Sequence, residues 1–185
     1  ALLGDGWGMP RSTHITGDSL KPVPDKLDIT FFSYLEDQFY RGQFDLPYDK
    51  LLKLFQDESR VKLKDKQGND QPDAFYLMAG VAPGGTVAVW FRSGRGNQEV
   101  FFGQAQKVER DLPNSLRIPI TDRAKRTVYV KEIIKDEIPP DILAAIRKNG
   151  IPFQKWANYR TQYNWAPTFA SNHPPQKFGI AFFNG

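Results

Sequence analysis

The residues able to carry out chemistry are few, and the first candidate is Ser19. Residues 17–20 spell Gly-Asp-Ser-Leu, a string that surrounds the nucleophilic serine of some hydrolases. A serine becomes a nucleophile only when a base lies within hydrogen-bond reach. Here the preceding stretch is polar rather than a buried strand, and Ala170 stands where an Asp-x-x-His ending at His173 would need its acid. These departures favour a chance match, and hydrolysis through Ser19 is kept as a minor hypothesis.

Other catalytic and metal-binding side chains are scarce. The chain has no cysteine and two histidines, His14 and His173. Disulfides, thiolate metal sites and cysteine nucleophiles are therefore excluded. Acidic residues stand side by side at three places, namely Glu36-Asp37, Asp57-Glu58 and Asp136-Glu137. Acid–base catalysis needs two carboxylates across a cleft with separated pKa values, and adjacency does not supply that. We therefore predict no catalytic residue, no metal and no cofactor.

The basic residues are concentrated in the second part of the chain. The 185 residues carry a net charge of +4, with 10 basic and 12 acidic residues before position 71 and 15 basic and 9 acidic residues after it. Nucleic-acid binding would place stacking aromatics among the basic residues. Only Tyr129 falls within the densest basic stretch, residues 117–131. We predict no nucleic-acid partner, although the positive surface could steer an acidic protein partner.

The hydrophobic pattern predicts the elements that position these side chains. Glycine and proline interrupt residues 1–26, which indicates an irregular N-terminal arm, and residues 27–185 are predicted to form one domain. Apolar and β-branched runs predict strands at residues 27–35, 39–46, 75–81, 86–91, 100–108, 127–134, 163–169 and 178–183. The glycine-rich stretch 92–98 predicts a hairpin between two of them.

Prolines and helical spacing predict two or three short helices. Pro47 opens the first, whose stripe is Tyr48, Leu51, Leu52 and Phe55. The second begins at Pro139-Pro140 and stops at Gly150, and Pro152 is the candidate start of a short third. Because the strands come in runs with few helices between them, we predict an α+β fold, mainly an antiparallel sheet in a single domain.

Several stretches together resemble a bacterial family. They are Gly6-Trp7-Gly8-Met9-Pro10, the strand pair 31–46 followed by Pro47, the Pro-Gly-Gly-x-Val-x-Val-Trp stretch 83–90, Tyr163-Asn164-Trp165, and the last apolar strand before Asn184-Gly185. This order is similar to small predicted lipoproteins known only as a domain of unknown function. Members are often encoded beside type VI secretion phospholipase effectors and are thought to be immunity proteins that bind and block those toxins.

The resemblance implies a non-enzymatic inhibitor of a cognate lipase effector in the periplasm. It also implies a lipid-anchored precursor whose cysteine precedes Ala1. Such an inhibitor needs only a rigid sheet with aromatic and arginine anchors on its loops. The candidate loops are residues 92–98, 11–14 and 165–173. The partner-binding residues that we predict are Arg92, Arg95, Asn97, Trp165 and His173.

The tryptophans leave a second hypothesis, a cell-envelope module that binds glycan or peptidoglycan on Trp and Tyr platforms. Trp90 lies within a strand pattern, so we expect it in the core. Trp7 and Trp165 lie in segments flanked by glycine or proline and could be exposed. A saturable response to sugars alone would favour this module over the inhibitor.

Overall fold

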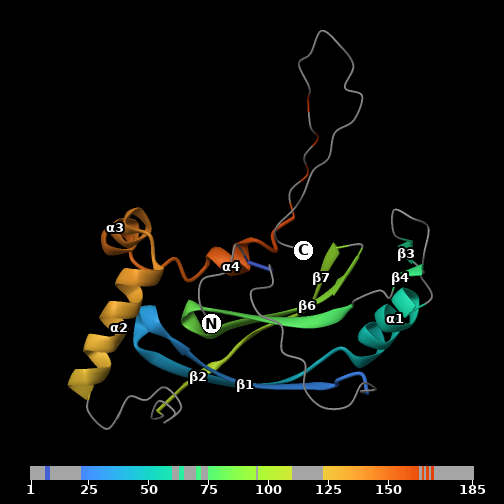
Figure 1. Ribbon diagram of the computed structural model, residues 1–185, viewed down its shortest axis with the longest axis horizontal. Coiled ribbons are helices and arrows are strands. Elements are labelled where there is room, and N and C mark those ends of the chain that lie inside the picture. Colours follow the sequence, from blue (N-terminus) through green and yellow to red (C-terminus); the bar gives the residue numbers. More distant parts are fainter. Residues whose placement is uncertain are drawn as a thin grey trace.

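Two antiparallel sheets of three strands form the centre of this computed structural model (Figure 1). The first sheet has the order β1-β2-β8, with β1 at Lys26–Ser33, β2 at Gln38–Asp45 and β8 at Gln106–Val108. The second has the order β5-β6-β7, with β5 at Tyr76–Ala82, β6 at Thr86–Ser93 and β7 at Gly96–Gln104. A further short pair consists of β3 (Leu63–Lys64) and β4 (Asp70–Gln71).

Helices lie at both ends of the sheets. The α-helices are α1 (Tyr48–Ser59), α2 (Arg123–Glu137), α3 (Pro140–Asn149) and α4 (Lys155–Asn158), and two 3₁₀ turns are η1 (Tyr34–Glu36) and η2 (Pro83–Gly85). Figure 1 shows α1 at one end of the molecule and α2 with α3 at the other. The predicted α+β class is confirmed. Within the described part of the chain, no helix is both long and apolar enough to cross a membrane.

The structure describes residues 7–8, 22–59, 63–64, 70–71, 75–94, 96–109, 123–162, 164, 166 and 168. Most of the arm predicted at residues 1–26 lies outside them. So do the strand predicted at 178–183 and most of the one predicted at 163–169. The candidate nucleophile Ser19 is also outside the described residues.

The two sheets pack against each other through alternate side chains. On β1, Leu27, Ile29 and Phe31 share one face because successive strand residues point to opposite sides. They contact a buried cluster that includes Tyr40 of β2 and Val87 of β6. The third member of that cluster, Ala105, is the single residue between β7 and β8, so the chain changes sheets there.

A second cluster joins α1 to the sheets. Leu51 is fully buried and packs with Leu46, Val89, Phe91 and Val100. The helix predicted after Pro47 is therefore confirmed, and Leu51 and Phe55 of its predicted stripe pack in this cluster, together with Leu54. Tyr48, the first residue of that stripe, is instead exposed.

The outer face of β6 is covered by an N-terminal tryptophan. The ring of Trp7 meets Trp90 edge to face at 5.0 Å and lies 6.3 Å from Trp156 of α4. Trp90 is buried, as the strand pattern predicts. Trp7 is half-buried in this contact, so the expectation that it could be exposed holds only in part.

The strand predicted at residues 127–134 is wrong, because these residues belong to α2. The β-branched run suggested a strand, but the half-buried and buried positions recur at helical spacing. They are Arg126, Tyr129, Val130, Ile133, Ile134 and Glu137. This face packs on η1, where the rings of Tyr129 and Tyr34 lie 6.4 Å apart. Tertiary packing thus overrides the weak strand propensity.

Candidate functional site

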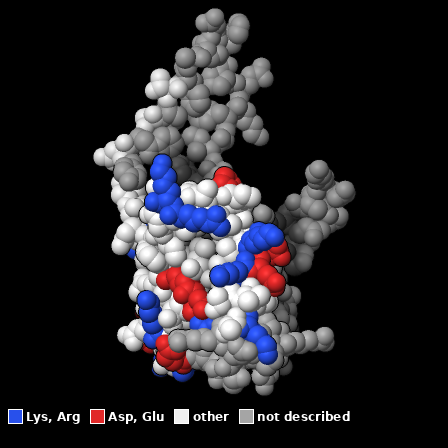
Figure 2. All heavy atoms as spheres, turned by 90° about the vertical axis from the view of Figure 1, so that its left-hand side faces the viewer, with Lys and Arg blue, Asp and Glu red and all other residues white. Residues whose placement is uncertain are grey.

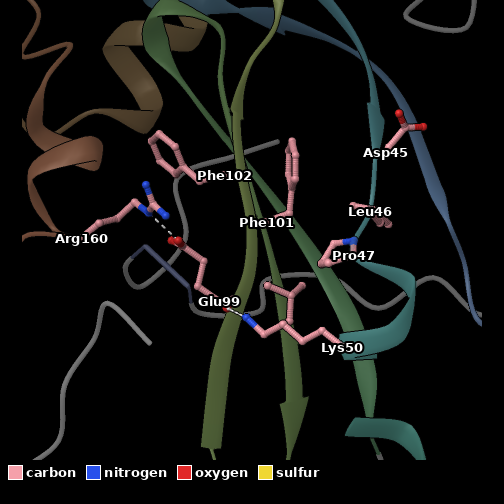
Figure 3. Close-up of a pocket in the computed structure, with 9 residues that line it drawn as sticks. Asp45, Leu46, Pro47, Lys50, Glu99, Phe101, Phe102 and Arg160 are labelled. Carbon is pink, nitrogen blue, oxygen red and sulfur yellow. Dashed lines mark hydrogen bonds and ion pairs between the residues drawn. The ribbon is translucent and has the colours of Figure 1, made fainter. Parts of the chain in front are cut away.

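A pocket of about 380 Å³ opens beside β7 (Figure 3). Its volume lies at the lower end of the roughly 300–1,000 Å³ range of ligand sites. Residues from four parts of the chain line it: Asp45, Leu46 and Pro47 at the end of β2, Lys50 of α1, Glu99, Val100, Phe101 and Phe102 of β7, and Arg160 after α4. The pocket therefore lies where β2, α1, β7 and the segment after α4 meet.

A bulge in β7 determines which side chains face Arg160. Trp90 pairs with Glu99 and Val89 with Phe101, which leaves Val100 as an extra residue. Without it, Glu99 and Phe102 would point to opposite faces of the sheet, because they are three positions apart. With it, both reach Arg160. Its Nε donates to Glu99 Oε1 at 2.6 Å, and its guanidinium lies 4.6 Å from the centre of the Phe102 ring.

Glu99 holds a second cation through its backbone. Its carbonyl oxygen accepts a hydrogen bond from Lys50 Nζ at 3.1 Å. Lys50 is placed there by the start of α1, where Leu51 N donates to Pro47 O at 3.0 Å and the buried Leu51 fixes the orientation of the helix. Glu99 thus positions an ammonium and a guanidinium group, the two side chains that bind oxyanions.

Of the residues that the structure describes, none of those predicted to bind a partner lines this pocket. Arg92 and Asn97 are paired across the β6–β7 hairpin, so the structure brings these two residues together. Arg95, Trp165 and His173 lie outside the described residues. The four pocket residues Lys50, Glu99, Phe102 and Arg160 were not predicted, because neither the bulge nor the approach of residue 160 to residue 99 has a local sequence signal.

Asn97 has a structural contact that the sequence did not indicate. Its Nδ2 donates to the carbonyl oxygen of Gly8 at 2.6 Å, next to the Trp7 contact. We expect Asn97→Ala to lower the free energy of unfolding by about 1 kcal/mol, the usual net value of one hydrogen bond. Urea unfolding measures this, and near-UV circular dichroism reports whether Trp7 loses its fixed environment.

The exposed neighbour Gln98 supplies the control for that experiment. Gln98→Ala should leave both the unfolding free energy and the near-UV spectrum unchanged. Equal behaviour of Asn97→Ala and Gln98→Ala would show that the bond to Gly8 contributes nothing to stability.

The adjacent acids Glu36 and Asp37 have separate structural partners. Glu36 accepts hydrogen bonds from the Tyr40 hydroxyl at 2.7 Å and from Gly84 N at 2.8 Å. Asp37 is bonded by Arg126 of α2, whose Nε lies 2.6 Å from Oδ1. Burial, followed by the bond to Glu36, raises the pKa of Tyr40. The pair is therefore not simply solvated, and it joins β2, η2 and α2.

A second ion pair lies on the solvent side of the first sheet. Arg41 Nη2 is 2.9 Å from Asp28 Oδ2. Hydrogen bonds from Arg41 and then Gln43 lower the pKa of Asp28. No group of three or more His, Asp or Glu residues suited to a metal ion occurs among the residues that the structure describes.

Comparison with known protein families gives a match. Residues 3–154 match the model of a family described as "Protein of unknown function (DUF2931)". No curated protein and no solved structure matches the chain.

Proposed function

Since the chain belongs to the DUF2931 family, whose function is unknown, we propose a function from its surface and its motifs. The protein is an immunity protein that binds and inhibits a cognate type VI secretion lipase toxin without catalysing a reaction. It acts in the periplasm as a lipid-anchored protein. The supporting sequence motifs are the Trp7 region, the Pro-Gly-Gly turn and the Trp165 region.

The observation that carries this proposal is that the segment 123–160 exposes three large apolar side chains. Val128, Ile142 and Phe153 expose 58%, 47% and 46% of their surfaces. Figure 2 shows the α2–α3 end of the molecule, where uncharged surface lies between groups of Lys/Arg and groups of Asp/Glu. Apolar anchors surrounded by charged residues are typical of a protein–protein interface. The sheets provide a rigid support, which lowers the entropic cost of binding.

Inhibition requires the complex to form in a fixed ratio and without turnover. We expect the purified protein and its cognate lipase to form a stable complex in which the lipase activity is lost, because the bound protein blocks the active-site mouth or holds a lid closed. Size-exclusion chromatography and a lipase assay measure the two effects. The proposal fails if the protein neither binds the lipase nor protects cells that express it.

A pair of matched variants tests the location of the interface. Ile142→Asp on α3 should weaken the complex at least about tenfold, because it places a charge in an apolar contact. Tyr48→Asp is the control, since Tyr48 is 44% exposed but lies on α1 at the opposite end of the molecule (Figure 1). Equal effects of the two substitutions would place the interface elsewhere.

A second candidate function, binding of a cell-envelope glycan, is favoured by the pocket beside β7. Aromatic rings together with a few fixed polar groups are what a polar ring-shaped ligand requires. Phe101 and Phe102 provide the rings, and Glu99 and Arg160 provide a fixed acceptor and donor. Saturable binding of glycan fragments, measured by calorimetry, would support this function.

A further inference from the structure

We propose that the pocket beside β7 binds a sugar that carries a carboxylate group, with Lys50 and Arg160 as the ligands of that carboxylate. The inference rests on the second candidate function, glycan binding, and adds to it a site and a chemical class of ligand. Its starting observation is that one residue, Glu99, positions both cations at the same pocket.

Both cations keep hydrogen-bond donors for a ligand. Arg160 uses Nε for Glu99, and among the described residues nothing bonds to its two terminal NH₂ groups. Its side chain remains 50% exposed. The ammonium of Lys50 is bonded to a backbone carbonyl and not to a carboxylate. An oxyanion between them would receive charge-assisted hydrogen bonds, which are about twice as strong as neutral ones.

The charge inside the pocket favours an anion. The carboxylate of Glu99 pairs with Arg160, whereas the ammonium of Lys50 is bonded to the Glu99 carbonyl oxygen and to no carboxylate among the described residues of the pocket. The fourth charged residue, Asp45, directs its carboxylate away from Lys50 and Glu99 in Figure 3. Because Glu99 neutralises only Arg160, the region around Lys50 attracts a ligand carboxylate.

The guanidinium is held in a fixed orientation before any ligand arrives. The Phe102 ring lies beneath it, and the bond to Glu99 fixes its rotation about the side-chain axis. A planar guanidinium that is already oriented loses less entropy when it binds a carboxylate through two parallel bonds. The bulge at Val100 is what allows both of these contacts.

The size and the apolar wall of the pocket fit a ligand larger than a small inorganic anion. A volume of about 380 Å³ leaves room for a ring beside the carboxylate. Phe101, Leu46 and Pro47 form an apolar wall on which the C–H face of a sugar can pack. The Glu99 carboxylate can accept hydrogen bonds from hydroxyl or amide groups of the ring. A saccharide with one carboxylate therefore uses every kind of group that lines the pocket.

Two sugars that differ by one acidic substituent provide the test. N-acetylmuramic acid has the ring of N-acetylglucosamine plus a lactyl ether that carries a carboxylate, so calorimetric titration of both measures the contribution of this lactyl group. We expect the unchanged protein to bind N-acetylmuramic acid at least about tenfold more tightly. Lactate alone should bind at least about tenfold more weakly than N-acetylmuramic acid, because it lacks the ring.

Variants locate the effect in the pocket. Arg160→Ala and Lys50→Met should each weaken binding of N-acetylmuramic acid at least about tenfold and reduce its advantage over N-acetylglucosamine. Arg160→Lys retains the charge without the planar fork, so its loss should be smaller. The control is Arg41→Ala, whose arginine also forms an exposed ion pair and has a 52% exposed side chain but does not line the pocket.

The outcomes separate this inference from the function on which it rests. If both sugars bind equally and the Arg160 and Lys50 variants match the unchanged protein, the proposed site is wrong and glycan binding stands. If lactate binds as tightly as N-acetylmuramic acid, the sugar class is wrong. If no sugar binds, glycan binding fails and the inference fails with it, while the inhibitor function is unaffected.

Discussion

Replacing Gly85 by alanine is expected to destabilise the protein by about 3 kcal/mol, the sum of a left-handed backbone strain and an overpacked core. Gly85 has φ 83°, a conformation that residues with a Cβ rarely adopt. A Cβ at this position would lie 2.6 Å from Cδ1 of the buried Tyr40 and would also collide with the carbonyl oxygen of Ala105. Neither neighbour can move freely, because Ala105 N donates to Gly85 O at 2.7 Å and the Tyr40 hydroxyl donates to Glu36 Oε1 at 2.7 Å. Urea unfolding monitored by tryptophan fluorescence measures the loss.

Gly150 separates the two causes. Its φ of 79° is also positive, with ψ 176°, and a Cβ there meets no atom within 4 Å. Gly150→Ala should therefore cost only a backbone strain of about 1–2 kcal/mol, with no overpacking added. If Gly85→Ala is no more destabilising than Gly150→Ala, the close packing of η2 against Tyr40 is not a constraint on the fold.

Removing the Glu36 carboxylate is the second large effect that we expect. Glu36→Ala leaves the buried hydroxyl of Tyr40 and the N–H of Gly84 without their acceptor. Each unsatisfied group costs about 1–3 kcal/mol, so the loss of unfolding free energy should be about 2–6 kcal/mol. Chemical denaturation of the single variant and of the variant combined with Tyr40→Phe measures it.

The double variant tests whether the network is the cause. Tyr40→Phe removes the hydroxyl that Glu36→Ala leaves unpaired, so the combined loss should be smaller than the sum of the single losses by about 1–2 kcal/mol. Strict additivity would contradict this explanation.

Because of Tyr40, we expect the free energy of unfolding to decrease at alkaline pH. Because the pKa of Tyr40 is raised in the folded state, its contribution to stability is complete below the unfolded value of about 10. The contribution then declines as the pH rises through that value. Tyr40→Phe should flatten this part of the curve of stability against pH.

Local signals in the sequence predicted much of the fold. The strands around Phe31 and Phe44, the helix after Pro47, the turn at Gly84-Gly85 and the helix that ends at Gly150 are all confirmed. Each depends on alternation, on proline at a helix start or on glycine at positive φ, which nearby residues determine. The segment 127–134 was predicted wrongly because its β-branched residues conceal a helical face that only the contact with η1 stabilises.

The candidate site could not be predicted from the sequence for a different reason. Arg160 and Glu99 are 61 positions apart, and Lys50 and Glu99 are 49 apart. The contact between Arg160 and Glu99 also depends on the bulge at Val100. That bulge follows from how β7 is aligned with β6. In the sequence alone, Arg160 cannot be distinguished from a solvent-exposed arginine, because its contacts depend on the backbone of β7. The roles of Arg92 and Asn97 as partner-binding residues stay predictions.

The passage of the chain through Ala105 has a consequence for how the protein folds. β7 and β8 belong to different sheets but are separated by this one residue, which is buried and bonded to Gly85. The hairpins β1–β2 and β5–β6–β7 connect strands that are neighbours in sequence, so they can form early. In contrast, β8 pairs with β2, and the paired residues, such as Arg41 and Gln106, are far apart in the sequence. Because contacts between distant residues form slowly, we expect the docking of β8 to complete the folding reaction and to make the two sheets one cooperative unit.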